Sequence, residues 1–102
     1  MGQDQSARRG REMIVGIAWF RAADWTRLLE ISEDRNELED SHAKWLEQAN
    51  RVLREVEKGG LKARRVVINL DELLAWAAAR KVPIDGKCRS NFVAEKVRQE
   101  EA

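Results

Sequence analysis

Residues 13–20 read Met13-Ile14-Val15-Gly16-Ile17-Ala18-Trp19-Phe20. This apolar run does not alternate with polar side chains, and its β-branched residues favour a strand that is covered on both faces. One face of such a strand carries the odd-numbered residues, and the other places Gly16 and Ala18 at its centre. Small side chains at these two positions let another element approach the strand closely. We therefore expect the first strand of the protein here.

Two helices are predicted after this strand. The first covers residues 22–31. Asp34 and Glu37 then have the spacing of a capping box, so the longest helix is expected to begin there and to run to about Lys58. The sequence Gly59-Gly60 would end it through a left-handed cap. Its apolar positions step by four and three residues in a heptad register: Leu38, His42, Trp45, Ala49, Val52 and Val56.

The second half of the chain predicts a strand and two further helices. A strand over residues 65–70 is followed directly by a helix over residues 71–80, with Asn69 as its cap. Leucines, alanines and Trp76 make that helix apolar on nearly every side, so we expect it to be largely buried. Asp85 or Ser90 would cap a last helix that runs to about residue 98 and turns inward the side chains of Phe92, Val93 and Val97.

The elements follow one another in the order β-α-α-β-α-α, which predicts an α+β domain with a two-stranded sheet packed with four helices. Because two helices between the strands reverse the chain twice, we expect the strands to be antiparallel. A two-stranded sheet alone is marginal and leaves both outer edges open. Either the helices cover it, or a second copy extends it across a two-fold axis. The domain would span residues 13–98, between a flexible segment 1–12 and a frayed tail 99–102.

Composition narrows the function classes. The 102 residues include 19 basic and 18 acidic side chains, so a net charge of +1 gives no global field to steer the chain toward nucleic acid or an anionic membrane. The longest apolar run is too short to cross a membrane. The single Cys88 has no internal disulfide partner, which indicates a reducing compartment. We expect a cytoplasmic protein.

The sequence carries few catalytic side chains. It has one histidine and no tyrosine, which excludes a catalytic triad or a histidine-rich metal site within one chain. Glu39 and His42 form a Glu-x-x-His pair, half of what a di-iron centre requires. We expect His42 at the rim of the core, hydrogen-bonded to Glu39. Cys88 is expected to be a small packed residue. No catalytic, cofactor-binding or metal-binding residue is predicted, and we expect no enzyme.

Charge and tryptophans leave two interaction hypotheses open. The long helix is acidic at its start and basic at its end, as its dipole prefers. The alternative is a nucleic-acid contact through the basic end, from Arg51 to Arg65. Tryptophans at the corner after the first strand favour core packing, but aromatic side chains beside an arginine are also typical of interaction hot spots. The candidate interaction surface is therefore Trp19, Arg21, Trp25, Arg54, Lys58, Arg64 and Arg65.

Several short runs also carry a resemblance. They are Ile17-Ala18-Trp19-Phe20-Arg21 with Asp24-Trp25, Ser32-Glu33-Asp34-Arg35, Asp71-Glu72-Leu73-Leu74-Ala75-Trp76, and Asp85-Gly86-Lys87-Cys88-Arg89 leading to Phe92-Val93-Ala94-Glu95. Over about residues 13–97 the chain resembles short, uncharacterised bacterial proteins. The resemblance implies a stand-alone bacterial domain and transfers no functional residue. Taken together, the sequence favours a small non-catalytic interaction or accessory module, which as a homodimer would use its long helix or its sheet edge.

Overall fold

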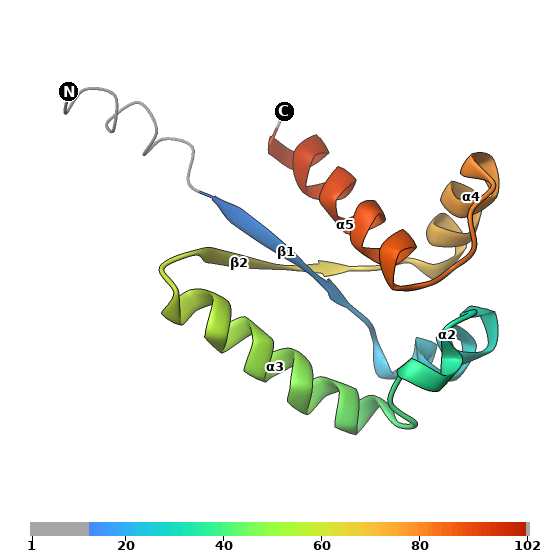
Figure 1. The fold of residues 1–102 in the computed structure, drawn as a ribbon, viewed down its shortest axis with the longest axis horizontal. Coiled ribbons are helices and arrows are strands. Elements are labelled where there is room, and N and C mark those ends of the chain that lie inside the picture. The colour runs from blue at the N-terminus through green and yellow to red at the C-terminus, as the bar shows by residue number, and fades with distance from the viewer. Residues whose placement is uncertain (1–12, 102) are drawn as a thin grey trace.

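The computed structural model describes residues 13–101 of the chain (Figure 1). The predictions for residues 1–12 and 102 lie outside the described residues. Two short 3-10 helices interrupt the first half, so the element order matches the expected one only loosely. The elements are β1 (Ile14–Trp19), η1 (Ala22–Asp24), α2 (Trp25–Ile31), η2 (Arg35–Glu37), α3 (His42–Lys58), β2 (Lys62–Val67), α4 (Leu70–Arg80) and α5 (Gly86–Glu101).

The two strands are parallel, so the prediction of an antiparallel pair is wrong. Ile14 is the register partner of Lys62, and Trp19 is the partner of Val67. The reason is that α2 does not run along the sheet. Its seven residues lie beyond the carboxyl end of β1, and only α3 returns along the strands (Figure 1). One returning helix between two strands produces a parallel crossover.

Helices α3 and α5 cover opposite sides of the sheet (Figure 1). The close approach expected at the small residues of β1 is confirmed, and α5 is the element that makes it. A Cβ atom added to Gly16 would lie 2.7 Å from both Val93 Cγ1 and Val97 Cγ2. That distance is shorter than carbon atoms tolerate, so the position requires glycine for α5 to pack on β1 as it does.

The long helix begins later than its capping-box signal predicted. Residues around Asp34 form the single turn η2, and Leu38 has extended backbone angles. The actual cap of α3 is Ser41, whose hydroxyl accepts a hydrogen bond of 3.2 Å from the Lys44 amide. The Asp34 carboxylate does not cap a helix because it is bound by Arg89. A tertiary partner therefore takes the side chain that the local pattern assigned to a cap.

The end of α3 is confirmed at the glycine pair. Gly60 has a φ of +87°, and the Leu61 amide donates to Val56 O at 3.2 Å while the Gly60 amide donates to Glu57 O at 3.0 Å. These two bonds form a Schellman motif. α4 ends in the same way at Lys81, a non-glycine residue with a φ of 58°.

Strand β2 lies three residues earlier than predicted, so Ile68 and Leu70 follow the strand and enter the core. The Asn69 cap of α4 is confirmed, since its Oδ1 accepts from the Glu72 amide at 3.0 Å. The expectation that α4 is largely buried is wrong. Leu70, Leu73 and Ala77 are buried, but the remaining alanines face solvent. An alanine-rich helix does not need full burial, because alanine has the best helix propensity and little apolar surface.

Helix α5 is capped by Asp85, the first of the two predicted caps, whose Oδ1 accepts from the Cys88 amide at 2.9 Å. It extends to Glu101, beyond the predicted end near residue 98. The expected inward residues Phe92, Val93 and Val97 are buried in the single core cluster. Within residues 13–101, every helix is too short or too polar to cross a membrane.

Candidate functional site

One edge of the sheet is open along β1. The Lys62 amide donates to Met13 O at 3.3 Å and the Ile68 amide donates to Trp19 O at 2.9 Å. The odd-numbered residues of β1 therefore direct their backbone groups at β2. Since these groups alternate along a strand, Ile14, Gly16 and Ala18 direct their amides and carbonyls away from β2. In the described part of the chain no third strand pairs with them.

A groove of about 320 Å³ runs beside this open edge. Gly16, Ala18 and Phe20 form its floor. The wall toward α3 is aromatic and apolar, and comprises Trp25, Leu38 and Trp45. The wall toward α5 is made mainly of small side chains, among them Gly86, Ser90 and Ala94. The groove therefore offers a row of backbone groups between two walls, which is the shape that an extended peptide fits.

The groove carries no net charge. Among the described residues that line it, only Arg89 is charged. Arg89 donates from Nη1 and Nη2 to the two oxygens of Asp34, at 3.1 and 2.6 Å, and these side chains are only 10% and 13% exposed. The same hydrogen bonds hold the pKa of the Asp34 carboxyl below its ordinary value of 3.8. Arg89 is thus neutralised by Asp34 and does not attract an anion into the groove.

Strand β1 is more exposed than its composition predicts. All six of its residues are apolar, yet each is only partly buried. Leu38 and Trp45 on the groove wall are also partly buried. A strand with apolar side chains on both faces is typical of the interior of a sheet. In this structure it occupies an edge.

Aromatic packing holds the α3 wall of the groove in place. Trp45 lies with its ring centroid 5.5 Å from that of Phe20 and 5.5 Å from that of Trp25. The His42 Nε2–H donates to Phe20 O at 2.7 Å, and the Trp25 Nε1–H donates to Glu39 O at 3.2 Å. These contacts join α2, α3 and the end of β1 into one rigid wall.

His42 therefore has a different partner from the one predicted. It binds the backbone of Phe20, while the Glu39 carboxylate accepts from Gln48 Nε2 at 2.6 Å. The position at the rim of the core is confirmed, since His42 is partly buried and lies 5.1 Å from the Trp45 ring. Among residues 13–101 no three His, Cys, Asp or Glu side chains gather where they would hold a metal ion.

The aromatic members of the predicted interaction surface separate in the structure. Trp25 is 4% exposed and belongs to the core. Trp19 is partly buried, with its ring 5.2 Å from Trp45 on one side and the Arg65 guanidinium 4.8 Å away. Arg21 is exposed and pairs with Asp24 at 3.0 Å. The fold thus brings Trp19 and Arg65 together and withdraws Trp25 from the surface.

One basic member of that predicted surface, Arg64, is separated from the other three. Arg64 pairs with Glu100 of α5, on one side of the sheet. Arg65 lies over Trp19, on the opposite side. Arg54 and Lys58 are exposed on α3. Arg64 is therefore separated from the other three cations, since Trp19 packs on Trp45 of α3 and places Arg65 on the side of the sheet that α3 covers.

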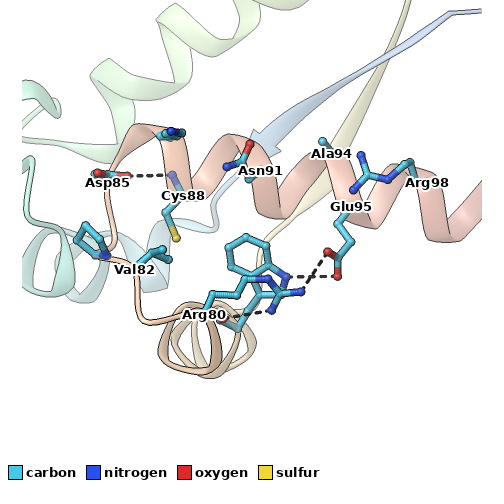
Figure 2. Close-up of a pocket in the computed structure, with 11 residues that line it drawn as sticks. Arg80, Val82, Asp85, Cys88, Asn91, Ala94, Glu95 and Arg98 are labelled. Carbon is cyan, nitrogen blue, oxygen red and sulfur yellow. Dashed lines mark hydrogen bonds and ion pairs between the residues drawn. The ribbon is translucent and has the colours of Figure 1, made fainter.

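A second groove, of about 460 Å³, lies between α4 and α5 (Figure 2). Two of its five charged lining residues, Arg80 and Glu95, bind one another. Glu95 accepts from Trp76 Nε1 at 3.3 Å and from Arg80 at 3.2 Å, and the Arg80 guanidinium lies 4.0 Å from the Trp76 ring centroid. Cys88 lies between the helices and is buried, as predicted, and burial raises the pKa of its thiol. Such a thiol is protonated and unreactive at neutral pH.

Comparison with models of protein families, with curated proteins and with solved structures gives no match to this chain. The resemblance to short bacterial proteins therefore stays a prediction.

Sequence reasoning missed the residues that shape the groove on its α5 side. Gly86, Ser90 and Ala94 recur every four residues, a spacing that places them on one face of α5. The signal is present in the sequence. Its meaning depends on knowing that this face borders the free edge of β1.

Proposed function

We propose that this protein is a protein-interaction module that accepts an extended polypeptide segment along the open edge of β1. The observation that carries the proposal is the row of outward backbone groups at Ile14, Gly16 and Ala18, set in an apolar groove without net charge. Addition of a strand to a sheet edge uses such groups for affinity and the adjoining side-chain pockets for specificity.

The energetics favour an apolar partner segment. Each backbone hydrogen bond contributes about 0.5–1.5 kcal/mol net, so three paired residues give only modest affinity. Burial of the groove walls supplies more, because Leu38 and Trp45 remain partly exposed in the isolated chain. A charged segment would lose its hydration in this groove without gaining an ion pair, since Arg89 is already bound to Asp34.

The nucleic-acid hypothesis has weaker support. It needs several cations on one surface. Arg64 is bound to Glu100, and Arg65 faces the other side of the sheet, over Trp19. Arg51, Arg54 and Lys58 remain exposed on α3, but Glu47 and Glu55 are exposed on the same helix. The open edge is the better candidate for function.

The experiment places a photo-crosslinking amino acid, p-benzoylphenylalanine, at Leu38 in cells that natively produce the chain. Leu38 is a large, partly buried side chain on the wall of the groove beside β1. The matched control is Leu53, a partly buried leucine of α3 that does not line this groove. We expect covalent protein adducts from position 38 and none from position 53. Equal adducts from both positions, or none from position 38, would contradict the proposal.

A further inference from the structure

We infer that the segment bound along β1 is β1 of a second copy of this chain, antiparallel to the first across a two-fold axis. The inference rests on the proposed function and names its partner. The resulting sheet has four strands in the order β2-β1-β1-β2, with the two β1 strands at its centre. Such an isologous contact closes on itself and leaves no further copy to add.

The two strands of this protein differ in the way that central and edge strands differ. β1 has the sequence IVGIAW and carries no charged residue. β2 has the sequence KARRVV and carries Lys62, Arg64 and Arg65. Charged side chains are a common protection of sheet edges against further pairing, whereas strands that are apolar on both faces lie in sheet interiors. In the four-stranded sheet each strand takes the place that its sequence suits.

Charge and polarity also favour β1 over other segments. The groove has no net charge because Asp34 neutralises Arg89. It therefore suits an uncharged strand that is apolar on both faces. Among the two strands of the described chain, only β1 meets this requirement, since β2 would bring three cations to the groove.

Strand β1 is complementary to itself in an antiparallel arrangement. The hydrogen-bonded pairs must join residues whose backbone groups point outward, which are the even-numbered ones. Centring the axis on Gly16 sets Gly16 opposite Gly16 of the partner subunit and Ile14 opposite Ala18 of the partner subunit. Each large side chain then faces a small one. On the other face Val15 lies opposite Ile17 of the partner subunit, a favourable pair of β-branched residues.

The α5 helices must also come close, because α5 packs directly on Gly16 and neighbouring strands lie only about 4.8 Å apart. Packed helices need about 8 Å between their axes, and reach this lower limit only where contact side chains are small. The α5 face along the groove has such side chains, at Gly86, Ser90 and Ala94. The groove wall thus has the residues that a two-fold contact between α5 helices requires.

The first test is sedimentation velocity on the purified chain from micromolar to millimolar concentration. We expect a dimer. Ser90→Arg should weaken it by about 100-fold or more, since a bulky cation in an apolar contact costs several kcal/mol and each 1.4 kcal/mol is tenfold. Asn91→Arg makes the same change one position away and should dimerise like the wild type. Thermal unfolding of both variants verifies that they fold. A wild-type monomer at the highest concentration, or a dimer that only Asn91→Arg weakens, overturns the inference.

The second test is amide hydrogen exchange of the wild type at several concentrations. The Val15 and Ile17 amides face β2 and should be protected at every concentration. The Gly16 and Ala18 amides should exchange fast in the monomer and become protected as the dimer forms. A dimer in which Gly16 and Ala18 stay unprotected uses another surface and overturns the inference.

The two proposals fail separately. A monomeric chain that still forms adducts from position 38 with another protein keeps the proposed function and removes the second copy as its partner. A monomeric chain without adducts removes both.

Discussion

Arg89 of α5 binds Asp34, which precedes η2 and lies 55 residues earlier in the chain, through two hydrogen bonds of 3.1 and 2.6 Å. The same guanidinium donates to Ser32 Oγ at 3.3 Å, and Ser32 in turn donates to Leu28 O at 2.7 Å. This chain of bonds ties α5 to the end of α2. It fixes the distance between the α5 wall and the aromatic wall of the groove.

Removal of the Arg89 guanidinium should lower the free energy of unfolding much more than the loss of a surface ion pair does. Arg89→Ala leaves the Asp34 carboxylate largely buried and unpaired, and we expect a loss of about 3 kcal/mol in the free energy of unfolding. The control is Arg27→Ala, which breaks an ion pair with Asp71 between side chains that are 46% and 79% exposed. That variant should lose less than about 1 kcal/mol. Urea unfolding compares them, and equal losses would refute the assigned role of Arg89.

The same ion pair predicts a pH dependence of stability. The folded-state pKa of Asp34 is lowered by its hydrogen bonds to Arg89. The contribution of the ionised Asp34 carboxylate to the free energy of unfolding is therefore fully present above the unfolded-state pKa. It is lost as the pH falls through the lower, folded-state pKa. Asp34→Asn should be less stable than the wild type at neutral pH, and the difference should shrink below about pH 4. Urea unfolding across this range measures it. A difference that stays constant with pH would contradict the prediction.

Gly16 should be intolerant of even one added carbon. Gly16→Ala places a Cβ 2.7 Å from Val93 and Val97, and overpacking of this kind costs about 1–3 kcal/mol. The double variant Gly16→Ala/Val97→Ala should lose less stability than the sum of the losses in Gly16→Ala and Val97→Ala, because the shorter side chain at position 97 makes room for the added Cβ. The control is Gly59→Ala, where the nearest atom lies at 3.5 Å and the φ of −77° suits any residue. Thermal unfolding measures all four variants, and a neutral Gly16→Ala would show that α5 does not pack on β1 as described.

Lys81 offers a stabilising substitution. Its φ of 58° is left-handed, a conformation that costs a residue with a side chain about 1–2 kcal/mol. Lys81→Gly removes that strain but increases the entropy of the unfolded chain, so we expect a net gain of about 0.5–1 kcal/mol. Lys81→Ala keeps the strain and should give no gain. If both variants are equally stable in urea, the left-handed cap does not form.

Local patterns predicted the elements whose signals depend on neighbouring residues. The apolar run of β1, the Asn69 cap and the glycine pair after α3 all appear where they were expected. Each rests on backbone hydrogen bonds or steric limits within a few residues. The capping box at Asp34 failed because Arg89, a distant residue, binds the carboxylate instead.

By itself, the sequence determined that two strands and the main helices form, and in which order, but not all of their bounds. It also determined where the glycine pair stops α3, and that another element approaches β1 at its small residues. These properties follow from local backbone geometry and side-chain size. The tertiary structure alone decided that the strands are parallel, that His42 binds Phe20, and that Ile14, Gly16 and Ala18 leave an open edge beside a groove. These depend on where α2 stops, on which side of the sheet α3 and α5 pack, and on contacts between residues far apart in the chain, which no short-range pattern encodes.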